Sequence, residues 1–158
     1  MLASQSLAIA AAEGGTTSAS PRSVAAPQEK TSGPAVGVGI DIVDVRRLQM
    51  LYERWQVAFL TRLFTEQEQV VCRNATGYRW YSLAGRFSAK EAVKKILASH
   101  GEMARWIDIE ILNGRFGEPF INLHGEAKAA LQRTGYTSLT LSISHDANMA
   151  TAMVVAYS

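Results

Sequence analysis

The chain has 158 residues, of which 47% are hydrophobic and 19% charged, and its formal net charge is +2. This length and composition predict a single globular domain with its own core. They exclude a membrane-spanning protein, because no apolar run approaches the length that crosses a bilayer. Cys72 is the one cysteine, so an internal disulfide is excluded and a reducing cytoplasm fits.

The small net charge hides an asymmetry along the chain. Residues 46–95 carry ten Lys and Arg against four Asp and Glu, whereas residues 102–146 carry four against six. The first segment is expected to present a positive surface, so its partner should be anionic. A nucleic acid, a phosphorylated small molecule and an acidic protein all fit this charge.

Residues 1–33 are rich in Ala, Ser, Gly, Thr and Pro and contain few large apolar side chains. Such a segment buries too little surface to offset the entropy of ordering it, which predicts a disordered or variable tail. Its apolar stretch, LAIAAA, is short and follows no positive charge, unlike a secretory signal. An expression artefact or a mis-assigned start is the alternative explanation.

The folded domain, residues 34–158, is expected to begin with a strand. AVGVGIDIVDV, residues 35–45, alternates with a period of two. One face carries Gly37, Gly39 and Asp41, and the other carries Val36, Val38, Ile40 and Ile42. The two glycines are expected to leave open space beside the Asp41 carboxylate.

Two capped helices are predicted next. Asp44 is a candidate N-cap for a helix over about 45–56, whose apolar side would end with Trp55. Thr65 stands three residues before Glu68, which is a capping box for a second helix.

A third, longer helix is predicted over about 79–98, and beyond it the apolar period changes to two. WIDIEI and FINL are expected strands joined by the turn NGRFGEP, and a short helix over 124–134 stops at Gly135. SLTLSISH and MATAMVVAY are the last two strands. The order β-α-α-α-β-β-α-β-β predicts an α+β fold with a largely antiparallel sheet.

Several familiar signatures are absent from the sequence. It has no P-loop, no third glycine for a dinucleotide fingerprint, and no Cys/His cluster with zinc spacing. Ser144, His145 and Asp146 are consecutive, and neighbouring strand residues point to opposite faces, so they do not form a catalytic triad.

Three candidate site residues remain, and each has a plain structural explanation. Asp41 could cap the next helix, although Asp44 already does so. Glu91 precedes Lys95 at the i, i+4 spacing of a stabilising helix pair. His145 could be an ordinary turn histidine.

Together, the same residues suggest phosphate chemistry. Two carboxylates from distant segments, with phosphate oxygens, make a hard oxygen site that suits magnesium. Lys95 would reach a phosphate bound to that metal, and His145 would donate to the phosphate or transfer a proton.

Two long segments carry a resemblance to a known family. VGVGIDIVDVRRL and LAGRFSAKEAVKKIL, followed by SISHD, resemble the holo-acyl-carrier-protein synthases, the small 4'-phosphopantetheinyl transferases. Those proteins carry a G-x-D-(I/L) strand and an R-F-x-(A/S)-K-E-A-x-x-K helix. FLTRLFTEQE and NGRFGEPFI also match intermediate family segments, so the resemblance runs from about residue 36 to 157.

The resemblance implies a fold, an activity and an assembly. Such enzymes transfer the 4'-phosphopantetheine group of coenzyme A to a serine of an apo acyl carrier protein and release adenosine 3',5'-bisphosphate. They share the 4'-phosphopantetheinyl transferase fold and are usually trimers, with coenzyme A in the cleft between neighbouring subunits. A fatty acid and a polyketide carrier protein are both open as the substrate, and neither a nucleic acid nor a membrane is expected as a partner.

The resemblance also implies a role for each site residue. Asp41 and Glu91 match the family's metal-binding carboxylates. Lys95 matches the lysine that contacts coenzyme A phosphates, and His145 matches a histidine near the pyrophosphate. Glu91, Lys95 and His145 are thus the expected catalytic residues, and the general base is either Glu91 or a water held by the metal.

The remaining basic residues are assigned to the two substrates. Arg86 and Lys90, in the same helical motif, are expected to face coenzyme A. Arg47 and Arg54 fall where the family presents arginines to the acidic carrier-protein helix.

One segment departs from the family pattern. The family continues the motif helix into a glycine-rich loop that wraps coenzyme A, whereas LASHGEMARW has one glycine, Gly101. We expect the nucleotide end to be held differently, with Arg105 or His100 as candidate substitutes. An inactive family member that binds or assembles with a carrier protein is the alternative function, and a nucleic-acid binder ranks behind it.

Overall fold

The computed structural model describes residues 35–158, so the predicted tail over 1–33 lies outside the described residues. The predicted α+β class and element order are confirmed, with one extra short hairpin before the third helix. The elements are β1 (Val36–Asp44), α2 (Val45–Leu63), α3 (Glu66–Val71), β2 (Arg73–Asn74), β3 (Gly77–Tyr78), α4 (Trp80–Ala98), the 3-10 turn η1 (Trp106–Asp108), β4 (Ile109–Asn113), β5 (Pro119–Leu123), α5 (Gly125–Thr134), β6 (Ser138–Asp146) and β7 (Met149–Tyr157).

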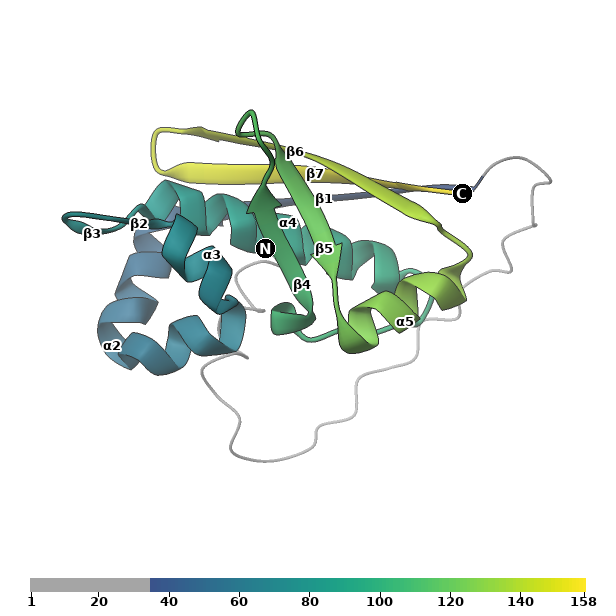
Figure 1. Cartoon of the computed structure of the whole chain (residues 1–158), viewed down its shortest axis with the longest axis horizontal. Coiled ribbons are helices and arrows are strands. Elements are labelled where there is room, and N and C mark those ends of the chain that lie inside the picture. Colours follow the sequence, from purple (N-terminus) through teal and green to yellow (C-terminus); the bar gives the residue numbers. More distant parts are fainter. Residues whose placement is uncertain (1–34) are drawn as a thin grey trace, which may run out of the picture.

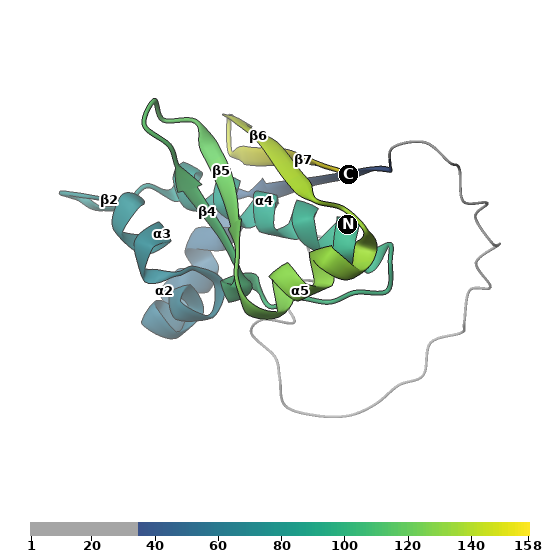
Figure 2. The same ribbon diagram turned by 45° about the vertical axis from the view of Figure 1, so that its right-hand side comes forward.

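The main sheet is antiparallel and has the strand order β1-β7-β6. The central strand is β7, whose Ala152 lies opposite Asp41 on one side and Ile143 on the other. Figure 1 shows α4 running along one face of this sheet. The turned view in Figure 2 shows the β4–β5 hairpin and α5 on the other side of α4, so the helix is enclosed between two layers.

Helix α4 is the centre of the hydrophobic core. Every residue from Leu83 to Val93 is buried, including charged ones, as expected for a helix covered on all sides. Its first half packs against apolar residues of α2 such as Leu48 and Leu60. Its second half packs against β4, α5 and β7. None of the helices within residues 35–158 is long and apolar enough to cross a membrane.

The expectation that the two glycines of β1 leave open space is wrong. A Cβ added to Gly39 would lie 2.0 Å from the Ala92 carbonyl oxygen of α4, and one added to Gly37 would lie 2.7 Å from the Tyr136 hydroxyl oxygen. The absence of a side chain at Gly39 lets α4 approach the strand closely, whereas at Gly37 the space is filled by Tyr136. The apolar face of β1, by contrast, is turned away from the core: Val36, Val38, Ile40 and Ile42 are all exposed.

Helix α2 begins as predicted but runs further. Asp44 caps it, with its Oδ1 accepting a hydrogen bond from the Arg46 backbone N–H at 2.9 Å. The helix continues past a kink at Gln56, whose φ is 49°. Trp55, which directly precedes this break and was expected on the apolar side, is 40% exposed.

The capping box of α3 is confirmed: the Thr65 hydroxyl accepts from the Glu68 N–H, and the Glu68 side chain accepts from the Thr65 N–H. The 124–134 helix also ends as predicted, with Gly135 in the left-handed conformation. The WIDIEI segment differs, because its first residues form the turn η1 before β4 begins.

Candidate active site

Asp41 lies on the helix-facing side of β1, two residues after Gly39, where the strand approaches α4 closely. The residue is 3% exposed. Its Oδ1 accepts a hydrogen bond from Lys95 Nζ at 2.8 Å. Within the described part of the chain, its buried Oδ2 accepts no hydrogen bond. Burial raises the pKa of Asp41, the bond from Lys95 works in the opposite direction, and the nearby Glu91 carboxylate adds to the rise.

Glu91 projects from the middle of α4 and is 5% exposed. The indole Nε1–H of Trp106 donates a hydrogen bond to its Oε1. The ammonium of Lys94 lies 4.0 Å from the same oxygen. Burial lowers the pKa of Lys94, and the Glu91 carboxylate works against that effect.

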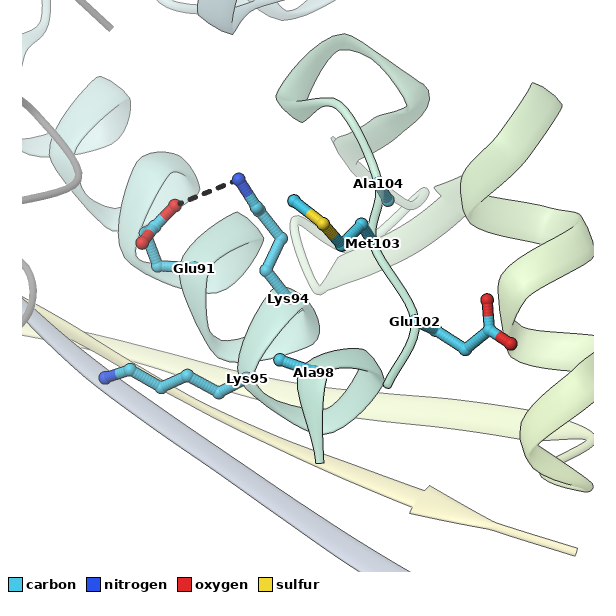
Figure 3. Close-up of a pocket in the computed structure, with 7 residues that line it drawn as sticks. All are labelled: Glu91, Lys94, Lys95, Ala98, Glu102, Met103 and Ala104. Atoms are coloured by element: carbon cyan, nitrogen blue, oxygen red, sulfur yellow. Dashed lines mark ion pairs between the residues drawn. The ribbon is translucent and has the colours of Figure 1, made fainter. Parts of the chain in front are cut away.

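The structural explanation of Glu91 as the ion-pair partner of Lys95 is wrong, because Lys95 is paired with Asp41 instead. Lys95 donates to Asp41 Oδ1 and, at 2.6 Å, to the Ile40 carbonyl oxygen. Figure 3 shows Glu91 and Lys94 turned toward one another, while Lys95 extends along the other side of the helix toward the β1 strand. Two adjacent lysines of α4 therefore pair with different carboxylates, Lys94 with Glu91 and Lys95 with Asp41.

A surface pocket of about 360 Å³ adjoins these groups. Glu91, Lys94, Lys95 and Ala98 of α4 line one side of it, and the loop residues Glu102, Met103 and Ala104 line the other. The pocket therefore combines cationic groups with an apolar wall, which suits a ligand that has both phosphates and an organic part.

The residues present fit a magnesium ion. Magnesium is typically bound by one or two carboxylates and completed by substrate phosphates and water. Asp41 offers a buried oxygen with no other partner in residues 35–158, and burying such an oxygen is costly unless something binds it. That stretch has no group of three or more His, Cys, Asp or Glu side chains that could bind a metal alone, so the substrate would have to supply the other ligands.

His145 is not brought to this pocket within one chain. Its ring lies 5.3 Å from the Tyr81 ring, at the beginning of α4. It lines a different hollow of about 190 Å³, together with Ile42, Met149 and Thr151 among others. The arrangement expected for His145, beside the two carboxylates, is therefore absent from the single subunit.

Arg86 and Lys90 lie inside the domain, so their prediction as coenzyme A contacts is wrong. Lys90 is fully buried, with its ammonium 2.7 Å from Glu68 Oε2 and 2.9 Å from the Trp106 carbonyl oxygen. Arg86 donates to the Ile111 carbonyl oxygen at 3.0 Å and to the Asn113 side chain. A helical period explains this: residues 86 and 90 are four apart and share a face that Glu91 and Lys95 do not.

Arg47 and Arg54 both lie on α2, and neither lines the pocket described above. Arg54 is exposed, and its guanidinium lies 5.1 Å from the centre of the Trp55 ring. Arg47 is half-buried. The two positions are seven residues apart, so they lie on one side of a helix.

The loop after α4 is fixed by residues other than those expected. Arg133 of α5 donates to both Glu102 oxygens, at 2.9 and 2.6 Å. Arg105, a candidate substitute for the glycine-rich loop, is instead paired with Asp108 at 2.9 and 2.8 Å. His100 lies edge-on to Tyr136, with ring centres 5.2 Å apart. Neither Arg105 nor His100 lines the pocket.

Trp106 is the site residue that the sequence analysis missed. It was treated as part of a strand, and only its neighbours in space show that its indole N–H reaches Glu91. The one signal in the sequence was that Trp106 ends the segment LASHGEMARW, which replaces the glycine-rich loop of the family.

The chain is similar to known proteins over most of its described residues. Residues 37–152 match the family model of the 4'-phosphopantetheinyl transferase superfamily. A holo-[acyl-carrier-protein] synthase of Natranaerobius thermophilus is 37% identical over 126 residues, covering 78% of this chain and 98% of that protein. One from Dehalococcoides mccartyi is 41% identical over 118 residues, covering 75% and 95%.

Solved structures of this kind share the fold. The Helicobacter pylori holo-[acyl-carrier-protein] synthase in complex with coenzyme A has a TM-score of 0.65 and 33% identity, covering 76% of this chain and 99% of that one. The Chronobacterium ammoniagenes enzyme with coenzyme A has a TM-score of 0.68 and 32% identity, covering 78% and 98%. The match spans the site residues from Asp41 on β1 to His145 on β6. The chain therefore belongs to the 4'-phosphopantetheinyl transferase superfamily.

Proposed function

We propose that this protein transfers the 4'-phosphopantetheine group of coenzyme A to a serine of an apo acyl carrier protein and releases adenosine 3',5'-bisphosphate. The observation that carries the proposal is the placement of Asp41 and Glu91 close enough to interact electrostatically, each paired with its own lysine, with Lys94 and Lys95 at the edge of an adjoining pocket. The relatives' names and the coenzyme A complexes among the similar structures support the substrates.

The chemistry is phosphoryl transfer, in which positioning and charge neutralisation supply most of the rate. The serine hydroxyl oxygen attacks the β-phosphorus, the bond to the bridging oxygen breaks, and the adenosine bisphosphate leaves with the bridging oxygen. The serine proton passes to a base, for which Glu91 is our candidate. Lys94 and Lys95 offset the negative charge that builds on the leaving group.

We further propose that Asp41 and Glu91 bind magnesium. When bound, the ion would neutralise the pyrophosphate of coenzyme A at the reacting bond. The support is the buried Asp41 Oδ2, which no group in residues 35–158 contacts by a hydrogen bond. Lys95 keeps the other oxygen of Asp41 occupied, at 2.8 Å, so that the carboxylate is fixed in orientation.

We also propose that three copies assemble through the outer face of the sheet. That face carries Val36, Val38, Ile40 and Ile42 of β1, of which the least exposed is 54% exposed, and Met153 of β7 at 45%. Contiguous exposed apolar surface of this kind marks an interface. The hollow of His145 is lined by Ile42 and Thr151 of the same face, so a neighbouring copy would lie beside it.

The carrier protein would dock on α2 through Arg47 and Arg54. The support is the excess of Lys and Arg over residues 46–95, ten against four acidic residues, which would attract an acidic partner. Tryptophan and arginine, which here lie together as Arg54 and Trp55, are frequent anchors at protein interfaces.

Mass spectrometry of an apo acyl carrier protein incubated with coenzyme A and magnesium tests the activity. We expect the carrier to gain one phosphopantetheine, and Asp41→Asn or Glu91→Gln to lower the rate by at least about a hundredfold while leaving the fold intact. Wild-type protein that binds the carrier without modifying it would favour the inactive, assembly-only alternative. Full turnover by either variant at ordinary magnesium concentrations would refute the assigned site.

A further inference from the structure

Trp106 connects the site to the interior of the domain. Its indole N–H donates to Glu91 Oε1, and the ammonium of Lys94 lies 3.7 Å from the centre of its ring. Phe87 of α4 supports the ring from within the core, with ring centres 6.3 Å apart. The one side chain thus touches the Glu91 carboxylate, the lysine beside it and the hydrophobic core.

The backbone of Trp106 is held by a buried ion pair. Lys90 Nζ donates to the Trp106 carbonyl oxygen at 2.9 Å and to Glu68 Oε2 at 2.7 Å, and both charged side chains are fully buried. Glu68 in turn accepts from the backbone N–H of Ile111 at 3.0 Å and of Thr65 at 2.8 Å. This chain of bonds ties η1 to α3, α4 and β4.

We propose that Trp106 is a positioning residue for Glu91, and that the Lys90–Glu68 pair positions Trp106. The inference deepens the proposed function, on which it rests. A glutamate has three side-chain torsions to fix, and the hydrogen bond from Trp106 to Oε1 fixes the carboxylate plane, which leaves Oε2 oriented for the metal ion that Glu91 would bind. The pair Lys95–Asp41 does the same for the other carboxylate.

A purely structural role for Trp106 makes a different prediction. If the indole only filled space between Phe87 and Lys94, a phenylalanine would serve nearly as well, because it keeps the apolar contact and loses only the N–H. The substitution Trp106→Phe therefore separates the two roles. Trp80→Phe is the matched control, since Trp80 packs against Tyr52 and Tyr78 in a part of the domain that lies away from Glu91.

The first measurement is binding of Mn²⁺, as a probe for magnesium, by electron paramagnetic resonance of the whole protein with coenzyme A. We expect Trp106→Phe to weaken Mn²⁺ binding about tenfold, since loss of a partner that orients a metal ligand costs ~10–100-fold in metal affinity. The catalytic constant should fall by a similar factor while KM for the carrier protein stays unchanged. Trp80→Phe should alter none of these values.

The second measurement needs no metal. The protein has three tryptophans, so a nitrogen–proton correlation spectrum contains three indole signals, and the one lost in Trp106→Phe belongs to Trp106. We expect Glu91→Gln to shift this signal strongly and to leave the other two in place. An unshifted signal, or Mn²⁺ affinity and turnover in Trp106→Phe equal to wild type, would overturn the proposal. A wild-type protein that binds no Mn²⁺ would instead overturn the magnesium site, while the indole shift would still support the contact.

Discussion

Replacing Gly39 by alanine should damage both stability and catalysis, because this glycine sets the spacing between β1 and α4. The added Cβ would lie 2.0 Å from the Ala92 carbonyl oxygen and 2.8 Å from its carbonyl carbon. An ordinary contact needs more than 3 Å, so strand and helix must separate by about 1 Å. Overpacking of this kind costs ~1–3 kcal/mol. We expect about 3 kcal/mol here, because the obstructing atoms are backbone rather than the end of a flexible side chain.

The same separation would pull Asp41, on β1, away from Glu91 and Lys95, on α4. A misplacement of about 1 Å in a catalytic arrangement can cost roughly a hundredfold in rate. Gly37→Ala is the matched control on the same face of β1, because its Cβ would meet the Tyr136 hydroxyl, at 2.7 Å, which is the end of a side chain. Urea unfolding gives the free energy of unfolding, and the carrier-protein assay gives the rate. If Gly39→Ala matched Gly37→Ala in both, the close approach would not be what positions the site.

Three further predictions concern surfaces and pH. Arg47→Glu with Arg54→Glu should raise KM for the carrier protein about tenfold and weaken its salt dependence, and a loss of coenzyme A affinity would instead place these arginines at the nucleotide. Ile40→Glu should convert a trimer to monomers in light scattering, whereas Val70→Glu, at a 71% exposed position on α3, should not. A wild-type monomer with full activity would contradict the assembly. Burial acts to raise the pKa of Glu110, but hydrogen bonds to its carboxylate outweigh this effect and lower the pKa below its ordinary value of 4.5. Those bonds come from Thr65, His124 and Asn122. The stabilisation is therefore present above pH 4.5 and lost as pH falls through the lowered pKa. In urea unfolding, Glu110→Gln should have a lower free energy of unfolding than wild type, and this difference should shrink toward pH 3. A difference that does not change with pH would contradict this.

Local signals in the sequence were sufficient for most of the fold. Asp44, the Thr65–Glu68 capping box and Gly135 each act within a few residues of their own position, so they predicted helix ends that the structure confirms. The kink at Gln56 had no such signal. The packing of Gly39 against α4 had no local signal either, because which element covers a strand is decided by the whole chain.

The site was predicted less completely, and the cations of α4 show why. A sequence gives their spacing, but the partner of each depends on what packs against that face of the helix. Lys90 faces the interior and meets Glu68, Lys94 meets Glu91 and Trp106, and Lys95 meets Asp41. Only the last two lie where they can act on a ligand in the pocket.

The position of His145 bears on both the proposed reaction and the proposed assembly. Tyr81, which His145 contacts, precedes Glu91 by ten residues on α4, or about 15 Å along the helix axis at 1.5 Å per residue. His145 and Glu91 of one chain therefore do not act on the same phosphate. The hollow of His145 is bordered by Ile42 and Met149, whose side chains belong to the exposed face of the sheet. If His145 takes part in the reaction, it does so in the site of a neighbouring copy, and the apolar face that joins the copies would then be as necessary for activity as the carboxylates themselves.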